Sequence, residues 1–434
     1  MAEYNNQTMS AAKGLSVVDK LRLLLDITKK ISRSLDVEEV VNLVMDTLDQ
    51  LLRYDAAGIY VVECEHGTDG KCVPSALKRF SKTAVRGYDI GEMSELHMKV
   101  GEGLIGHVAK TGEPLIVPDV RLDPRYVNAR HATRSEMIAP IISSEEVLGV
   151  FDLESDELNA YDEDDLEVLM LLASHVAIIL EKAMLYEQSI ERRRLQAQLE
   201  VARQVQLELL PPRDPKLEGF DISAYNFSTE EVSGDYYDFV PIYDDHLGLV
   251  IADVSGKGVP AALLMAFLRA SLRAAIQIGY APNISMAKVN YLLWESTENN
   301  QFVTAFYGVL DATNKTLAYA NAGHNPPLLM DAEGQARFIE RGGIPLGMFR
   351  DTRYYEYYVP IEPGQTLVLY TDGATEAAGT DGCEFGRDRL EEKVREGKDL
   401  SAKELIKSLH GAILEWTDGR GSSDDVTFVV VKAL

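Results

Sequence analysis

The sequence predicts an α+β protein in which two globular domains are joined by a long helix. In residues 219–434, strand patterns are separated by short turn clusters, and strands joined by so few residues must pair antiparallel. Residues 162–210 contain no glycine or proline and keep a helical pattern up to Pro211. Residues 15–153 begin with helical patterns and continue with strands. A chain of 434 residues is long enough for two or three such domains.

The N-terminal part is expected to contain two helices followed by five strands. Apolar residues recur at helical spacing in two segments of residues 15–53. The glycine-containing segment 101–109 is typical of a turn that enters a short helix. The predicted strands are 56–62, 84–88, 114–117, 135–142 and 147–153. The spacing of Cys64, His66 and Cys72 matches no zinc pattern, so we interpret that segment as a loop between two strands.

The long helix is expected to pack along one stretch and to pair along another. Residues 169–185 are richly apolar and should pack on the N-terminal sheet or on a twin subunit. Beyond them, a heptad pattern extends over about two repeats. Its apolar positions are Leu195, Leu199, Ala202 and Leu209, with Gln206 at the position between the last two. A parallel homodimer and a solvated connector helix of one subunit both fit this pattern. We favour the homodimer because a long uncapped helix has little support alone.

The C-terminal part is expected to form a meander of strands covered by helix pairs. The predicted strands are 220–224, 247–252, 303–310, 316–321, 327–330, 354–359, 366–370 and 426–431. The predicted helices are 259–278, 284–296, 386–395 and 402–416. Short connections between several of these strands predict mostly antiparallel sheets.

Composition excludes several classes of partner. The net charge of −26 argues against nucleic acid and against an anionic membrane surface. We find no 18-residue apolar stretch, so we expect no transmembrane helix, and residues 1–14 lack the pattern of a signal peptide. The three cysteines are an odd and sparse set, which is typical of a reducing compartment. The expected localisation is cytoplasmic.

Four aspartates in the second half of the chain indicate metal chemistry. Asp253 and Asp372 end apolar runs, whereas Asp235 and Asp424 lie beside a turn residue or a second acid. Four carboxylates gathered at the rim of a sheet would repel one another and raise each other's pKa. Two hard divalent cations remove this conflict, because Mg²⁺ and Mn²⁺ prefer carboxylate and water ligands. Such a pair can activate water and polarise a phosphoryl group, so the residues predict a dinuclear metal-dependent hydrolase.

Six collinear motifs carry a family resemblance. They are Ser-Gly-Asp-Tyr-Tyr-Asp (233–238), Ala-Asp-Val-Ser-Gly-Lys-Gly (252–258), Ala-Asn-Ala-Gly-His-Asn-Pro (320–326), Gly-Ile-Pro-Leu-Gly (343–347), Tyr-Thr-Asp-Gly-Ala-Thr-Glu (370–376) and Ser-Asp-Asp-Val-Thr (423–427). In this order they resemble the metal-dependent serine/threonine protein phosphatases (PPM, or protein phosphatase 2C-like), in particular the bacterial sporulation and stress-response branch. The resemblance covers about residues 198–434 and implies a four-layer α-β-β-α sandwich.

The N-terminal part resembles a GAF sensory domain, which implies a central antiparallel sheet with helices. The resemblance rests on residues 101–109, 112–120 and 148–155. GAF domains often bind small molecules, but the ligand here is unknown. The Asn-Lys pair of the cyclic-nucleotide-binding subset is replaced by Glu154-Ser155. The predicted domains are a tail (1–14), a GAF domain (15–185), a helical coiled-coil linker (186–217) and a PPM phosphatase domain (218–434).

The PPM resemblance implies a role for each site residue. Asp253 would bridge two Mn²⁺ or Mg²⁺ ions with help from the backbone carbonyl of Val254, Asp235 and Asp372 would complete one metal's shell, and Asp424 would bind the other. Asp253 and Asp372 would thereby hold the metal-activated water that attacks phosphorus. The chain has Ser255 in place of the family's histidine, and Thr229-Glu230-Glu231 in place of its phosphate-binding arginine. His324 and Lys257 are therefore the candidates for general acid and phosphate clamp.

The leading hypothesis is a GAF-regulated phosphoserine/phosphothreonine protein phosphatase. The bacterial branch implies a phosphorylated STAS-domain anti-sigma-factor antagonist as substrate, in a partner-switching pathway. A catalytically weak phosphoprotein-binding scaffold is an alternative, which the four filled acidic positions oppose. A metal-dependent nucleotide phosphodiesterase is another, although the sequence has no Gly-x-x-x-x-Gly-Lys-Ser/Thr loop.

Overall fold

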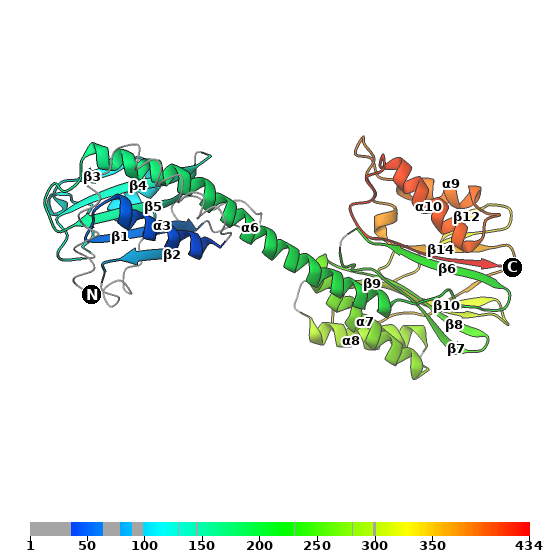
Figure 1. Ribbon diagram of the computed structural model, residues 1–434. Helices are drawn as coiled ribbons and strands as arrows, with labels where there is room; N and C mark the ends of the chain where they lie inside the picture. The colour runs from blue at the N-terminus through cyan, green and yellow to red at the C-terminus, as the bar shows by residue number, and fades with distance from the viewer. Residues whose placement is uncertain are drawn as a thin grey trace. The chain divides into compact units, whose positions relative to one another are not determined.

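The computed structural model describes residues 36–63, 79–88 and 99–434, apart from 129, 145, 230, 280 and 298–300. The chain divides into two compact units, residues 1–194 and 195–434 (Figure 1). The first predicted helix, Cys64, His66 and Cys72 lie outside the described residues.

The N-terminal unit is built on one antiparallel sheet with the strand order β2-β1-β5-β4-β3. Its strands are β1 (Ala56–Glu63), β2 (Arg79–Arg86), β3 (Leu115–Val117), β4 (Ser135–Ser143) and β5 (Glu146–Ser155). Its helical elements are α3 (Val37–Leu51), α5 (Gly103–Thr111), the short 3-10 helix η3 (Val120–Leu122) and the first part of α6 (Glu163–Leu209). The expected antiparallel sheet with helices is confirmed.

Each face of this sheet packs against its own helices. Because side chains alternate along a strand, Ile59 and Phe151 point to one face, where they share a core with residues of α3 and α6. Tyr60 and Val150 point to the opposite face, where they pack with α5. This second face also carries acidic side chains, which are considered below.

Helix α6 confirms the predicted long helix over 162–210. Both α6 and α7 (Gly258–Gln277) contain an 18-residue stretch that is apolar enough to cross a membrane by length and composition. The expectation that the sequence holds no such stretch is therefore wrong. In α6, Leu169 and Leu180 are buried in the N-terminal core, and in α7, Leu268 is buried against a sheet. A helix that buries one face in a core passes the same test.

The C-terminal unit has two five-stranded antiparallel sheets, in the orders β13-β10-β9-β8-β7 and β12-β11-β14-β15-β6. The strands of the first are β7 (Tyr236–Tyr243), β8 (His246–Val254), β9 (Val303–Asp311), β10 (Thr316–Ala322) and β13 (Tyr357–Pro360). Those of the second are β6 (Phe220–Phe227), β11 (Leu328–Met330), β12 (Ala336–Phe338), β14 (Thr366–Tyr370) and β15 (Val426–Ala433). The helical elements are α7, α8 (Pro282–Ser296), η4 (Asp372–Ala374), α9 (Gly386–Glu396) and α10 (Ala402–Trp416).

Three cores hold these elements in four layers (Figure 1). Leu249 and Phe306 of one sheet meet Leu367 and Val429 of the other in the central core. The outer faces are covered by α7 and α8 on one side and by α9 and α10 on the other. The α-β-β-α sandwich implied by the PPM resemblance is confirmed.

Strands β7 and β12 were not predicted. Strand β7 begins at Tyr236, inside the first of the six motifs, and it contains Pro241, which is unusual within a sheet. The structure resolves this conflict because β7 pairs only with β8 and forms the edge of its sheet. Proline is tolerated on an edge strand, where its missing N–H need not pair.

An ion pair between a buried carboxylate and a partly exposed guanidinium ties β7 to α7. Asp238 of β7 is fully buried, and its carboxylate accepts two hydrogen bonds from Arg273 of α7, at 2.6 and 2.8 Å. The hydroxyl of Tyr236 also donates to Asp238. Asp238 is thus occupied by Arg273, which favours the supporting role for this residue over direct metal ligation. Removing the guanidinium would leave an uncompensated buried charge.

We therefore expect Arg273→Met to lower the free energy of unfolding of the C-terminal unit by about 3 kcal/mol or more. The measurement is urea unfolding of the intact chain, with the exposed Arg353→Met as the matched control. The double variant Asp238→Asn/Arg273→Met should recover part of the loss, since it carries no unpaired charge. A single variant as stable as the control would show that the ion pair does not hold the two elements together.

Candidate metal centre

The ends of four strands bring the predicted aspartates to one edge of the sandwich. Asp253 lies at the end of β8, and Asp235 precedes β7, which pairs antiparallel with β8 and so starts where β8 ends. In the second sheet, Asp372 follows β14 and Asp424 precedes β15, which are likewise an antiparallel pair. The topology alone therefore places two aspartates at the same edge of each sheet.

Asp235 is the most deeply buried of the four, with 3% of its surface exposed. Its Oδ2 accepts hydrogen bonds from the hydroxyls of Thr371 and Thr427, at 2.9 and 2.5 Å. Both threonines belong to the second sheet, so these bonds fasten Asp235 across the two sheets. Burial raises the pKa of Asp235, and repulsion from Asp253 raises it further. The two hydroxyls oppose this shift but do not cancel it.

Mutual repulsion also acts on the other aspartates. Burial raises the pKa of Asp253 to about 7, with further contributions from Asp372, Asp424 and Asp425. Burial and then Asp424 raise the pKa of Asp372. The cluster therefore holds more negative charge than its surroundings stabilise, which is the condition predicted for a site that binds cations.

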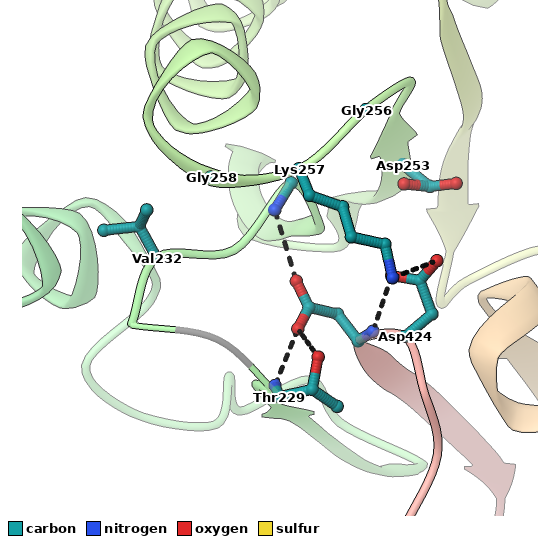
Figure 2. Close-up of a pocket in the computed structure, with 9 residues that line it drawn as sticks. Thr229, Val232, Asp253, Gly256, Lys257, Gly258 and Asp424 are labelled. Carbon is teal, nitrogen blue, oxygen red and sulfur yellow. Dashed lines mark hydrogen bonds and ion pairs between the residues drawn. The ribbon is translucent and has the colours of Figure 1, made fainter. Parts of the chain in front are cut away.

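The open side of the cluster carries a lysine. Lys257 extends toward Asp424, and its Nζ lies 3.3 Å from the carboxylate and donates to the carbonyl of Ser423 at 2.7 Å (Figure 2). Both side chains are about half exposed, at 46% and 50%. They line a small pocket together with Asp253. Asp424 is thus the accessible member of the cluster, with an ammonium beside it.

Asp425 organises the backbone around the pocket. It accepts hydrogen bonds from the backbone N–H and hydroxyl of Thr229, at 2.8 and 3.1 Å, and from the N–H of Gly234 at 3.3 Å. These bonds occupy both of its oxygens, which favours a supporting role. Gly373 passes so close that an added Cβ would lie 2.1 Å from the carbonyl oxygen of Asp425. Only glycine fits at that crossing.

The donor set at this edge fits a hard divalent cation. Asp235, Asp253, Asp372 and Asp424 supply carboxylates, and the carbonyl oxygen of Val254 lies near Gly234, at 3.1 Å from where a Cβ would be. Oxygen ligands of this kind are those that Mg²⁺ and Mn²⁺ prefer. When bound, such ions lower the pKa of water and neutralise charge on a transferring phosphoryl group. The protein's own contribution is to fix the carboxylates through threonine and backbone donors.

A second acidic group lies at the opposite end of the paired strands β8 and β9. Asp245, His246 and Asp311 place one potential ligand atom each within 4.8 Å of one another. His246 begins β8 whereas Asp253 ends it, so this group is separate from the predicted site. Its side chains already bond to one another and to Thr313. Exposed acidic groups are common without a metal, and we interpret this one as a hydrogen-bonded cluster at the end of the paired strands β8 and β9.

Within the described part of the chain, His324 makes no hydrogen bond to the four aspartates and instead contacts the strand that pairs with β8. It is 4% exposed, and its Nδ1 is 2.9 Å from the hydroxyl of Thr304, the residue opposite Asp253 on β9. Asn321 bonds to the backbone N–H and carbonyl of His324. Burial lowers the pKa of His324 to about 4, so the ring is neutral at pH 7. This placement favours a structural role, and the catalytic role of His324 stays a prediction.

Comparison with known proteins identifies both parts of the chain. The family model described as Stage II sporulation protein E (SpoIIE) matches residues 243–434, and the GAF domain model matches residues 34–181. Over 239 residues the chain is 30% identical to the phosphoserine phosphatase RsbU of Bacillus subtilis (strain 168), covering 55% of this chain and 70% of RsbU. The chain belongs to the SpoIIE-type PPM phosphatases. It is a protein serine/threonine phosphatase that carries a GAF domain.

Two further relatives agree with this assignment. The phosphoserine phosphatase RsbP of Bacillus subtilis (strain 168) is 26% identical over 239 residues, which cover 54% of this chain and 57% of RsbP. The chain thus spans less than two thirds of that relative. The SiaA-PP2C domain of Pseudomonas aeruginosa superposes with a TM-score of 0.51 at 22% identity, covering 56% of this chain and 98% of that domain. This likeness bears on the fold alone. Phosphatases of this family are metal-dependent.

Gln206 of α6 is a supporting residue to which the sequence analysis assigned no role. It is 8% exposed and makes two hydrogen bonds to the backbone of Ser233: its Nε2 donates to the carbonyl at 2.5 Å, and its Oε1 accepts from the N–H at 2.9 Å. The hydroxyl of Ser233 in turn accepts from the N–H of Asp235 at 3.1 Å. The linker helix therefore holds the loop that carries Asp235. The only sequence signal was a polar residue at an apolar heptad position.

We expect Gln206→Leu to raise the Mn²⁺ concentration for half-maximal activity about 10-fold, as is typical when a residue behind a metal ligand is removed. The turnover number at saturating Mn²⁺ should change much less, because the ligands themselves remain. The measurement is phosphatase activity against Mn²⁺ concentration, with the exposed Gln204→Leu as the matched control. An unchanged Mn²⁺ dependence would show that this contact does not position Asp235.

Proposed function

We propose that the chain hydrolyses phosphoserine and phosphothreonine in a phosphorylated protein, with two Mn²⁺ or Mg²⁺ ions held by Asp235, Asp253, Val254, Asp372 and Asp424. The observation that carries the proposal is the convergence of these carboxylates at one edge, with the pKa of Asp253 raised by burial and by its neighbours. The names of RsbU and RsbP as phosphoserine phosphatases support the substrate class.

The charges around the pocket support a phosphoryl substrate. Asp424 and Lys257 are the half-exposed side chains at its mouth, whereas Asp235 is buried behind them. Among the described residues that line the pocket, Lys257 is the one cation. We assign Lys257 to the phosphate, because the arginine of the family pattern is absent at 229–231. When a metal neutralises Asp424, the ammonium is released to pair with a phosphate oxygen.

The physiological substrate proposed is a phosphorylated STAS-domain anti-sigma-factor antagonist, and the compartment proposed is the cytoplasm. Neither alternative function explains the site as well. A scaffold that only binds phosphoproteins has no need of four acidic positions in metal-ligating order. Phosphoproteomics of a deletion strain tests the substrate: a STAS-domain phosphoserine should accumulate, and unchanged STAS phosphorylation would contradict the assignment.

Regulation is proposed to pass through α6 in a parallel homodimer. Leu171, Ile178 and Leu185 are exposed at heptad spacing on this helix, with exposed fractions of 36%, 67% and 59%. Two further heptads lead from Leu185 to Leu199, so the predicted coiled-coil register continues into the GAF part of the helix. At the other end, Gln206 is used within its own chain, which limits the dimer seam to residues before it. The seam would thus connect sensor and catalytic loop.

For the activity itself, we expect Asp253→Asn and Asp372→Asn to reduce hydrolysis of a phosphoserine peptide at saturating Mn²⁺ by at least about 1,000-fold. Each change removes an anionic ligand at constant volume, and several kcal/mol of lost charge stabilisation correspond to this factor. EDTA should abolish the wild-type activity. The exposed Asp351→Asn is the matched control, and circular dichroism checks folding. Near-wild-type turnover in either variant would exclude the two-metal assignment.

For the regulation, we expect one residue inserted after Gln198 to change basal activity several-fold, because it rotates the downstream helix by about 100°. Seven inserted residues should nearly restore the original activity, since they almost complete whole turns. The measurement is activity of the three chains together with their mass in solution. Equal activity in all three, with the dimer intact, would leave the GAF domain as a passive dimerisation module.

A further inference from the structure

The face of the GAF sheet that packs on α5 carries three carboxylates. Glu136 lies on β4, and Asp152 and Glu154 lie on β5. Glu136 is directly opposite Glu154, and Asp152 is opposite Ile138 in the same ladder. Because alternate residues share a face, all three side chains point to the side occupied by Ile138 and Val150. The phosphatase mechanism uses none of them.

These carboxylates are buried, and the described part of the domain places no unpaired cation against them. Glu136, Asp152 and Glu154 are 2%, 0% and 3% exposed. Burial raises the pKa of each, and repulsion within the group raises the pKa of Glu136 and Asp152 further. Among the described residues, the cation that acts on the group is Arg130, which is paired with Asp156. Buried acidic groups are otherwise found with a partner, so this arrangement is costly unless a ligand completes it.

Two polar atoms in and beside this group, one carboxylate oxygen and one hydroxyl, have no hydrogen-bond partner among the described residues. The hydroxyl of Tyr88 lies 3.0 Å from Oδ2 of Asp152 and 2.8 Å from Oε1 of Glu154. Thr133 donates to the other oxygen of Glu154. Oδ1 of the fully buried Asp152 has no partner among the described residues, nor does the buried hydroxyl of Tyr126. An unpaired carboxylate oxygen at this depth is costly, and none of the described residues supplies the missing donor.

We propose that this face of the GAF domain binds an organic cation through its N–H donors, a primary ammonium or a guanidinium group. Such a group brings both the missing charge and several donors. The hydroxyl of Tyr88 stands between Asp152 and Glu154, which favours separate N–H bonds to each carboxylate over one metal ion held between them. Tyr60 and Phe80, packed edge to face at 5.9 Å, provide an apolar wall on the same face for the ligand's carbon chain.

The position of the site connects it to the linker helix. Asp152 and Glu154 stand at the end of β5, and α6 starts at Glu163, shortly after that strand. A ligand that draws these carboxylates together would act on the strand that leads into α6. This consequence rests on the proposed regulation through the linker, whereas binding itself does not.

The test is calorimetric titration of the intact chain at saturating Mn²⁺ with butylamine, putrescine and agmatine. The fully N-methylated analogue of putrescine has the same charge and chain but no N–H donor, and CaCl₂ probes a metal ion. We expect at least one of the amines to bind with a Kd below about 10 mM, and the methylated analogue to bind at least about 10-fold more weakly. Saturation by CaCl₂ in place of the amines, or no binding by any of the three amines, would overturn the proposal.

Matched variants connect binding to the named residues. Asp152→Asn and Glu136→Gln keep the shape but remove a charge, and each should weaken binding at least about 10-fold. The exposed Glu113→Gln, in the same domain, should bind as the wild type does. In the absence of ligand, the two buried variants should unfold at the same temperature as wild type or a few degrees higher, because they relieve buried repulsion. Undiminished binding by both would overturn the assignment, and the readout does not depend on phosphatase activity.

Discussion

The repulsion among buried carboxylates at the shared edge of the two C-terminal sheets is the constraint on which the catalytic half of the molecule depends. Antiparallel pairing of β7 with β8 and of β14 with β15 delivers Asp235, Asp253, Asp372 and Asp424 to that edge. The pKa of Asp253 is raised to about 7 by burial and by repulsion from Asp372, Asp424 and Asp425, so protein groups alone stabilise the charge of this site poorly. Bound divalent cations would relieve this repulsion and would also neutralise charge on a phosphoryl group.

Hydrogen bonds from outside the cluster determine how rigidly it is presented. Thr371 and Thr427 fasten Asp235 to the opposite sheet, and Ser233 fastens the same residue to Gln206 of α6. Asp235 is thus supported both by the core of its own domain and by the linker. The hydrogen bonds from Thr371 and Thr427 persist as long as the sandwich is folded. The linker contact lasts only while the helix keeps its place, which makes it the natural point for regulation.

The sequence predicted most of the catalytic half because its signals are local. The aspartates stand at the ends of apolar runs or beside turns, and the motifs containing Asp253 and Asp372 have a fixed order. Strand β7 was missed because a proline such as Pro241 is unusual within a strand. The pairing explains its presence, since β7 lies at the edge of its sheet. The roles of Gln206 and of the GAF carboxylates were also missed. Both depend on which residues meet across the fold, and neither the heptad pattern nor the alternation along β5 contains that information.

The two acidic clusters of this chain differ in which hydrogen-bond donors occupy their carboxylate oxygens. This difference suits each cluster to a different kind of ligand. At the catalytic edge, hydroxyl and backbone donors bind one side of Asp235 and Asp425, while Asp253 and the half-exposed Asp424, with Lys257 beside it, line one small pocket. In the GAF sheet, a tyrosine hydroxyl is inserted between two carboxylates and spaces them apart. Spaced acceptors suit a ligand with several directional donors, whereas converging ones suit a spherical ion. In both places, carboxylates that are buried before a ligand binds lower the stability of the ligand-free protein. Binding of a ligand therefore increases the stability of the folded protein by a larger amount.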